Sequence, residues 1–317
     1  MDKVFKITLI LYFKVDYHIK TIKKNKLKIR GEIDIVDIIN YITRQSHKPL
    51  IVIPVILIVL SLLYLGVFGL NEGIDLKGGT MVTLDVNPST TSNQITDNIE
   101  KTLGVSDVKT SIDGSTATVE IPVDINQVTF EQKFSNQYNI LSFKSVGALL
   151  TDASITQIIY ALVFAFVFMA ATVFFVFRDI VPSAAIILSA ICNLSIAVGG
   201  MSLFGIPLSV ASVGALLMLI GYGVDTDILL TTRLLKRKEG SLDDRAENAC
   251  RTGLTMTITA LSAMVVLFLV VIIFIPAASV LEEISAVLII GLLSDLLSTW
   301  LMNLGILKWH AERGGKH

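Results

Sequence analysis

Residues 70–86 read "LNEGIDLKGGTMVTLDV", and they mark the point where a long apolar run ends and a segment of different composition begins. Acidic residues, a lysine and three glycines follow the run, and "TMVTLDV" then alternates as a β-strand does. The stretch has two alternative interpretations: a phosphate-binding loop, or a joint between a membrane helix and a domain folded in water.

The spacing of the glycines and the lysine decides between these alternatives. A phosphate loop of the Walker type reads G-x-x-x-x-G-K-S/T, whereas Lys77 here precedes the glycine pair and no helix pattern follows. Glycine accepts positive φ angles and close backbone contacts, as a sharp change of chain direction requires. We therefore predict a hinge between helix and domain, formed by Gly73, Asp75, Gly78 and Gly79.

The apolar run before this stretch is the first of six that are long enough to cross a membrane. The chain has 317 residues, of which 53% are hydrophobic and 17% charged, and its mean hydropathy is +0.70. One span needs about 20 apolar residues. The six candidate spans lie near 49–70, 154–177, 180–204, 206–230, 253–275 and 284–307. An even number of spans places both termini on the same side.

Lysine and arginine are unevenly distributed, which predicts the orientation. Of the 26, 21 lie before span one, between spans two and three, between spans four and five, or after span six. Short loops rich in these residues stay in the cytoplasm. The other five lie between the first two spans together with 11 acidic residues. We expect a cytoplasmic basic segment with an interfacial helix (1–48), transmembrane helix 1 (49–70), an extracytoplasmic domain (71–152), transmembrane helices 2–6 (153–307) and a cytoplasmic tail (308–317).

The outward-facing segment has the pattern of a small α+β domain. "SNQITDNIEKTLG" is predicted to be a helix that begins at a serine cap and ends at Gly104. "VSDVKTSI" and "STATVEIPV" flank an Asp113-Gly114 turn and form a hairpin. A helix near 126–138 and a strand, "NILSFKSV", complete the order β-α-β-β-α-β. The predicted fold is therefore membrane α-helical, six transmembrane helices with a ferredoxin-like (βαββαβ) extracytoplasmic domain between helices 1 and 2.

Acidic residues inside the predicted spans point to function, because each costs about 2.5–3.5 kcal/mol at a helix centre. Asp225 and Asp227 lie in span four, about 9–12 Å inward of Arg233 on a helix that rises 1.5 Å per residue. Residues two apart point about 200° away from each other, so one is available to the bundle and the other to a different subunit. Asp295 lies near the middle of span six, within a turn of three hydroxyl residues, Ser294, Ser298 and Thr299.

Two interpretations of these acids are open. In the simpler one, local unwinding brings the span-four pair to the interface and Asp295 is a neutral acid bonded to a serine. In the functional one they form a proton path, because low dielectric favours the protonated form of a carboxylate and lets it take up and release protons. Arg251 begins span five and is expected to be a counter-charge, next to a threonine stripe of Thr252, Thr255 and Thr259. The candidates for a proton or ion relay are Asp225, Asp227, Asp295 and Arg251.

Small residues recur in the same spans. Gly214, Gly221 and Gly223 lie in span four, and Gly199 and Gly200 lie in span three. Small side chains let helices approach closely or shift against each other. Plain packing is the simpler explanation of this pattern.

Other functional classes receive little support from the sequence. Cys192 and Cys250 have no metal-ligand spacing, so we expect neither a metal nor a cofactor. A net charge of −1 argues against a nucleic-acid partner, and the basic N-terminal segment fits anionic membrane lipid better. An intramembrane aspartyl protease needs a G-x-G-D motif, but "GYGVD" is one residue too long and Asp225 and Asp295 differ in depth. We expect a protein that is not an enzyme.

Four motifs together resemble the SecF family, the smaller half of the SecD/SecF protein-export pair in the resistance-nodulation-division superfamily, in its archaeal type. They are "GIDLKGGT", "FRDIVPSAAIILSAICNL", "LIGYGVDTDILLTTRL" and "RTGLTMTITAL". Arg251 matches the span-five arginine of the family. The aspartate of bacterial members falls at Thr226, and Asp225 matches the aspartate in the span-four motif of SecD. Asp295 stands where bacterial members have a small hydroxyl residue.

The resemblance implies an accessory subunit of the Sec protein translocase. Its partners would be a SecD-like subunit, the Sec channel, the translocating polypeptide and membrane lipid, and proton flow between the paired subunits would drive movement of the outer domains. The alternative is a half-transporter of the same superfamily that exports lipid or small molecules. Such a transporter would normally carry two large outer domains in a chain of twelve spans.

Overall fold

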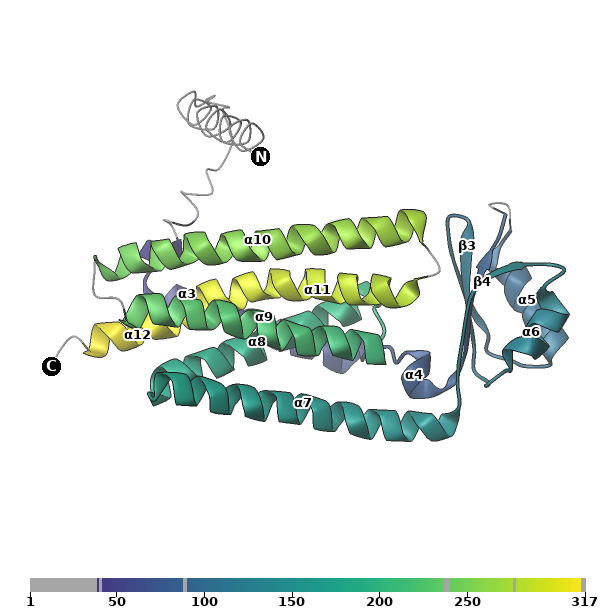
Figure 1. Cartoon of the computed structure of the whole chain (residues 1–317), viewed down its shortest axis with the longest axis horizontal. Coiled ribbons are helices and arrows are strands. Elements are labelled where there is room, and N and C mark those ends of the chain that lie inside the picture. Colours follow the sequence, from purple (N-terminus) through teal and green to yellow (C-terminus); the bar gives the residue numbers. More distant parts are fainter. Residues whose placement is uncertain (1–38, 40–41, 88–89, 237–239, 276–277, 315–317) are drawn as a thin grey trace, which may run out of the picture. The chain divides into compact units, whose positions relative to one another are not determined.

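The computed structural model describes residues 39, 42–87, 90–236, 240–275 and 278–314 (Figure 1). Within them, six helices are long and apolar enough to cross a membrane, which confirms the predicted number. They are α3 (His47–Phe68), α7 (Ala148–Phe177), α8 (Ile180–Phe204), α9 (Val210–Thr231) with the π-helical η1 (Thr232–Lys236), α10 (Leu242–Phe274), and α11 (Ser279–Leu297) with the π-helical η2 (Ser298–Asn303) and α12 (Leu304–Gly314). The basic segment 1–30 and most of the predicted interfacial helix 31–47 lie outside the described residues.

Helix α10 begins at Leu242, although its apolar pattern predicts a start near residue 253. Ser241 caps it: the Ser241 Oγ accepts a hydrogen bond from the Asp244 amide at 3.1 Å, and the Ser241 amide donates to the Asp244 carboxylate at 3.1 Å. A capped polar helix of about three turns therefore precedes the apolar part, and hydropathy alone does not detect it.

The sixth helix continues to Gly314, so most of the segment predicted as a tail is the end of this helix. Lys308 holds it in place, with a side chain that is 4% exposed. Its amine lies 2.7 Å from the Asp243 carboxylate and donates to the main-chain oxygens of Thr43 and Gln45. A lysine is rarely buried to this extent unless partners satisfy its charge, as these three do.

The outer domain contains β1 (Gly79–Asp85), α5 (Ser92–Leu103), β2 (Lys109–Asp113), β3 (Thr116–Ile121), α6 (Gln127–Phe134) and β4 (Asn139–Val146). The strand order is β2-β3-β1-β4, and every neighbouring pair is antiparallel. The predicted hairpin is present, with Gly114 at φ 59°. The predicted serine cap of the first helix is wrong: Thr91 is the N-cap, in a capping box with Gln94. The second helix ends at Phe134, earlier than predicted.

Helices α5 and α6 cover one face of this sheet (Figure 1). The core between them is built from alternate strand residues and from one side of each helix, and it includes Val82, Leu84, Ile95, Ile99, Val119, Phe130 and Phe134. Its two phenylalanines pack with ring centroids 4.6 Å apart. An independent core of this kind holds the domain in shape beside the membrane helices.

Glycines bring several membrane helices close together, as the sequence predicts for Gly199 and Gly200. A Cβ atom added at Gly199 would lie 2.7 Å from the Ser61 Cβ on α3, and one added at Gly200 would lie 2.6 Å from Ile290 on α11. Gly253 of α10 faces the Trp300 ring in the same way. Gly214 and Gly221 have nothing within 4 Å, so their missing side chains make no close contact in this chain.

The joint between α3 and the sheet is tied to the loop before α9. The Gly73 amide donates to the Leu208 oxygen at 2.7 Å, and the Leu208 amide donates to the Asn71 oxygen at 2.7 Å. The short α4 (Ile74–Lys77) follows, and Gly78 and Gly79 then turn the chain with φ of 75° and 122°. Gly73 has a negative φ of −71°, so it is needed for close approach to Ser209 and not for a positive φ.

Candidate functional site

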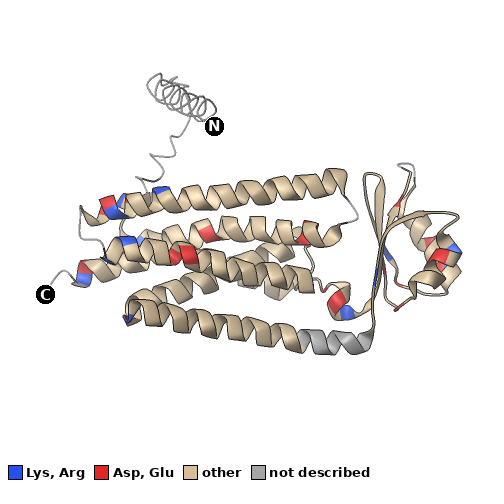
Figure 2. Ribbon diagram, viewed as in Figure 1, with Lys and Arg blue, Asp and Glu red and all other residues tan. Residues whose placement is uncertain are grey.

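Two of the three candidate aspartates lie inside the helix bundle. Asp227 and Asp295 are each 1% exposed, whereas Asp225 is exposed on the outer side of α9. The opposite directions of Asp225 and Asp227 agree with their two-residue spacing on a helix. Figure 2 shows acidic residues in the middle of the helices, away from the basic residues near one end of the bundle.

Asp227 is held by two neighbouring elements. Its Oδ1 atom accepts hydrogen bonds from the Ser189 hydroxyl of α8 at 3.2 Å and from the Asn303 amide of η2 at 2.8 Å. Both donors are buried. Neither carries charge, so these contacts orient the carboxylate without neutralising it.

Asp295 has a similar pair of neutral donors. Its Oδ1 atom accepts from the Asn193 amide of α8 at 3.3 Å and from the Thr299 hydroxyl of η2 at 3.3 Å. Ser294 donates in turn to the Asn193 side-chain oxygen. Ser189 and Asn193 are one turn apart on α8, and Thr299 and Asn303 are four residues apart in span six. The two carboxylates therefore occupy successive levels, about 6 Å apart along α8.

Gly223 makes room for the Asp295 carboxylate. A Cβ atom at this position of α9 would lie 2.9 Å from the Asp295 Oδ1 and 3.1 Å from the Asn193 Nδ2. Because Gly223 has no side chain, the Asp295 carboxylate and the Asn193 amide can lie directly against the α9 backbone.

Gly223→Ala is expected to lower the stability of the purified protein by about 1–3 kcal/mol, because the added methyl group overpacks the Asp295 carboxylate. The measurement is the thermal unfolding midpoint in detergent. Gly221→Ala is the matched control, since this neighbouring glycine has nothing within 4 Å. Equal midpoints for the two variants would show that Gly223 does not hold Asp295 in place.

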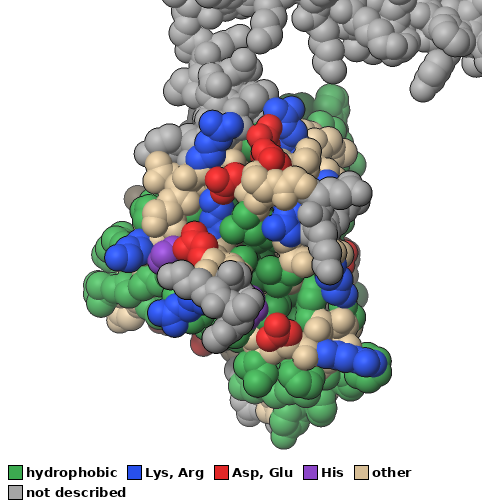
Figure 3. Space-filling view, turned by 90° about the vertical axis from the view of Figure 1, so that its left-hand side faces the viewer, with side chains coloured by type: hydrophobic (Ala, Val, Ile, Leu, Met, Phe, Trp, Pro, Cys, Tyr) green, Lys and Arg blue, Asp and Glu red, His purple; other side chains and the backbone are tan. Residues whose placement is uncertain are grey.

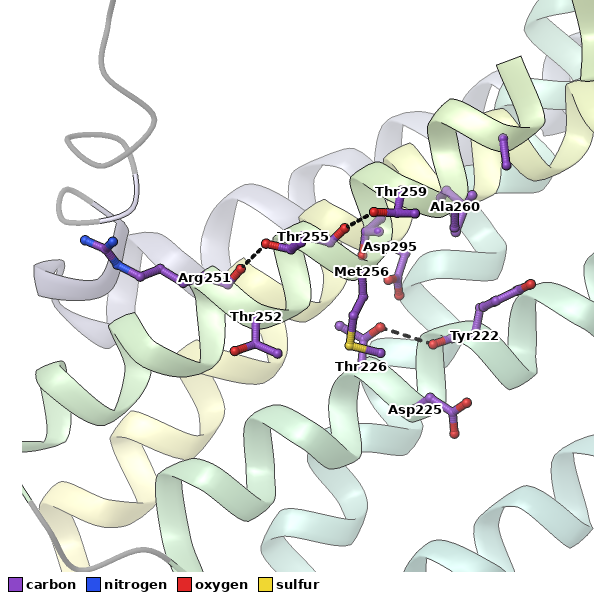
Figure 4. Close-up of a pocket in the computed structure, with 13 residues that line it drawn as sticks. Tyr222, Asp225, Thr226, Arg251, Thr252, Thr255, Met256, Thr259, Ala260 and Asp295 are labelled. Carbon is purple, nitrogen blue, oxygen red and sulfur yellow. Dashed lines mark hydrogen bonds between the residues drawn. The ribbon is translucent and has the colours of Figure 1, made fainter. Parts of the chain in front are cut away.

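A cavity of about 840 Å³ lies between α9 and α10 and reaches Asp295 (Figure 4). Asp225 and Tyr222 of α9 line one side, and the α10 residues include Arg251 and the three predicted threonines. The hydroxyls of Thr252, Thr255 and Thr259 each donate to the carbonyl four residues earlier. The oxygens of Thr255 and Thr259 can therefore accept hydrogen bonds from the cavity, whereas the Thr252 oxygen accepts one from the Arg233 guanidinium at 2.7 Å. The cavity connects an exposed acid with a buried one.

Arg251 is not a counter-charge to the aspartates in this structure. Its guanidinium pairs with Glu247, one turn earlier on α10, at 2.8 Å. Figure 4 shows the guanidinium directed away from Asp225 and Asp295. Among the described residues, no salt bridge reaches Asp225, Asp227 or Asp295. The glutamate competes successfully because residues four apart on a helix are neighbours.

Basic side chains gather on the end of the bundle where α7 and α8 meet (Figure 3). Three of them lie over aromatic rings: Arg178 over Phe175, Lys236 over Phe177 and Arg313 over Trp309. Cation–π contacts of this kind suit side chains at the boundary between lipid and water. The three candidate aspartates lie apart from this charged end, whereas Arg251 belongs to it through its pair with Glu247 (Figure 2).

Three residues that bind the two buried carboxylates, Ser189, Asn193 and Asn303, were not predicted from the sequence. A usable signal was present: an asparagine one turn after a serine in span three, and a second asparagine eight residues after Asp295. The π-helical η2, which carries Thr299 and Asn303, was not predicted either. Short π-helical segments inside α-helices often occur at functional sites.

Known proteins of one family are similar to this chain in sequence. A family described as "Protein export membrane protein SecD/SecF, C-terminal" matches residues 126–313, and one described as "SecD/SecF GG Motif" matches residues 64–90. A curated relative named "Protein-export membrane protein SecF" from Methanothermobacter thermautotrophicus is 51% identical over 269 residues, which is 84% of this chain and 94% of that protein. A relative of the same name from Methanocaldococcus jannaschii is 43% identical over 274 residues, 84% of this chain and 96% of that protein.

A solved structure is similar in fold. The crystal structure of SecDF, a translocon-associated membrane protein from Thermus thermophilus, matches with a TM-score of 0.69 and 18% sequence identity. The match covers 90% of this chain but only 39% of that one. The likeness shows a shared fold, and this chain corresponds to about two fifths of the length of that protein.

Proposed function

We propose that this chain, which belongs to the SecD/SecF family of protein-export membrane proteins, pairs with a SecD-like subunit as the SecF-like half of an accessory complex of the Sec translocase. The strongest support is the 51% sequence identity to a SecF protein over 94% of that protein's length. The chain is a multi-pass membrane protein with a SecF-like accessory role in Sec translocation, and its relatives are named as protein-export membrane proteins.

The exposed side of α9 is the surface on which the partner would dock. Gly214, Met218, Gly221, Tyr222 and Asp225 recur along this side at helical spacing, and all five are exposed. Small residues favour close helix contact in a membrane, whereas a carboxylate facing lipid is costly. A second subunit over this face would remove Asp225 from lipid and close the cavity between α9 and α10.

A Gly214→Leu, Gly221→Leu double variant is expected to lose most of its association with the SecD-like subunit, because two leucines prevent close helix contact at this face. The measurement is co-purification of that subunit in mild detergent. Gly66→Leu on α3 is the matched control, because Gly66 is also exposed with nothing within 4 Å. Equal recovery with all variants would place the partner elsewhere.

Proton coupling is the mechanism that best fits the acids. Asp225 would exchange protons at the cavity mouth, Asp295 at its inner end and Asp227 one level nearer the start of α8, beside Ser189. No side chain in the described part of the chain pairs with them as a cation, so each can change charge without breaking a salt bridge. Arg251 could act in this path only after leaving Glu247.

The orientation proposed here has both termini in the cytoplasm and the segment 71–152 outside. The strand order β2-β3-β1-β4 with two crossover helices supports a ferredoxin-like assignment for the outer domain. In that position the domain could engage the translocating polypeptide as it leaves the Sec channel. The basic residues at the opposite end would then meet anionic membrane lipid.

The test uses membrane vesicles from cells depleted of this chain. Export of a secretory protein should fall after depletion, and an imposed proton gradient should stimulate export only when the chain is restored. Export that is unaffected by depletion would overturn the proposed role. Stimulation that persists without the chain would overturn the coupling to protons.

A further inference from the structure

Four charged or polar side chains meet where the outer domain joins the membrane helices. They are Asp75 of α4, Lys144 of β4, Ser209 at the N-cap of α9 and Glu283 near the start of α11. The Lys144 amine lies 2.7 Å from the Asp75 carboxylate. The Ser209 hydroxyl donates to the Glu283 carboxylate, and Glu283 also interacts electrostatically with Lys144 and Asp75.

Asp75 is attached by hydrogen bonds to the start of membrane helix α9. Its carboxylate accepts a hydrogen bond from the Val210 amide at the first residue of α9, at 3.3 Å. Two main-chain hydrogen bonds between Asn71–Gly73 and Leu208 tie the same segment to the loop before α9. The side chain of Asp75 is only 9% exposed. A movement of α9 along its axis would therefore carry Asp75 with it.

Lys144 belongs to the outer domain. It lies on β4, which pairs with β1 on both sides of one register shift, and Met81 is its direct partner. Between Asp75 and β1 there are only Leu76, Lys77 and Gly78, and β1 itself begins at Gly79; both glycines have positive φ. The ion pair thus bridges the turn at Gly78–Gly79, with the membrane helices on one side and the sheet on the other.

Both helices that carry intramembrane acids begin at this cluster. Helix α9 holds Asp225 and Asp227 and starts at Val210, and α11 holds Asp295 and starts at Ser279, four residues before Glu283. A shift of either helix on a change of charge at its acids would alter the surroundings of the Lys144 amine. Among the residues that the structure describes, no other salt bridge joins the outer domain to the membrane helices.

We propose that Lys144 is a positioning residue that latches the outer domain to the acid-bearing helices through Asp75, with Gly78 and Gly79 as the pivot. The latch rests on the proposed function, in which these helices respond to proton flow. The Lys144 side chain is 39% exposed, so the pair can open without burying an unpaired ammonium group. Opening frees the sheet to rotate, and closing returns it to one orientation.

The test measures the distance between the two parts in the full-length protein with its partner. Cysteines for spin labels are introduced at Ser111 on β2 and Ile273 on α10, which line opposite sides of a cavity of about 580 Å³ between sheet and helices. The native Cys192 and Cys250 are buried and leave labelling to the introduced sites. The variants are Lys144→Met, Lys144→Arg and, as a control, Lys133→Met. The exposed Lys133 amine donates to the Thr102 main-chain oxygen within the outer domain.

Lys144→Met is expected to broaden the distance distribution and to lower gradient-stimulated export about fivefold or more, as for a coupling of ordinary strength. Lys144→Arg, which keeps the charge, and Lys133→Met should resemble the parent protein. Asp75→Asn provides a second way to open the pair. An unchanged distribution in both Lys144→Met and Asp75→Asn would overturn the latch. A broader distribution with normal export would overturn its coupling to export, whereas failure of the proposed function would appear as export insensitive to removal of the whole chain.

Discussion

Asp295→Asn is expected to abolish the stimulation of export by a proton gradient while leaving the protein folded and associated with its partner. The asparagine side chain has nearly the shape of the protonated carboxyl and can still be bonded by Thr299, but it cannot release a proton. Loss of a group that must transfer protons typically costs on the order of 100-fold or more in rate. Export in inverted vesicles, measured with and without an imposed gradient, gives the comparison.

Asp97→Asn is the matched control, because Asp97 lies exposed on α5 of the outer domain. The same change there should leave both export rates unaltered. An Asp295→Asn protein that keeps the full response to the gradient would contradict the relay. In that case the simpler interpretation, a neutral acid that serves packing, would account for Asp295.

Gly79→Ala is expected to destabilise the outer domain by about 2–5 kcal/mol, the sum of a positive φ and a steric clash. Gly79 has a φ of 122°, and an added Cβ atom would lie 2.5 Å from the Ile121 main-chain oxygen on β3. This oxygen cannot rotate away as a side chain can. Hydrogen exchange of the β1 and β3 amides in the full-length protein measures the change.

Gly114→Ala separates the two contributions. Gly114 also has a positive φ, 59°, but nothing lies within 4 Å of its Cβ position. We expect a loss of about 1–2 kcal/mol from the φ angle alone. Equal losses at the two glycines would show that the close contact of Gly79 with β3 contributes nothing.

Local chemistry made much of this fold predictable. Apolar length gave the six membrane helices, and the alternating strands with an Asp113-Gly114 turn gave the order of elements in the outer domain. The helical repeat correctly predicted that Asp225 and Asp227 point in different directions. These features depend on neighbours in the sequence, which a single chain displays directly.

Contacts between distant segments were harder to predict. Nothing local shows that Ser189 and Asn303, more than one hundred residues apart, hold the same carboxylate. Arg251 was expected to face the aspartates, but Glu247 lies one turn away on its own helix and forms the shorter-range pair. The tie between Asp75 and the start of α9 likewise depends on how the helices pack.

Pairing with a SecD-like subunit can be tested by affinity purification of the tagged protein from its native membrane in mild detergent, with identification of partners by mass spectrometry. We expect recovery of a separate SecD-like subunit with six spans and a larger outer domain. Recovery of this chain alone, as a homo-oligomer, would contradict the pairing and favour an independent half-transporter for lipid or small molecules.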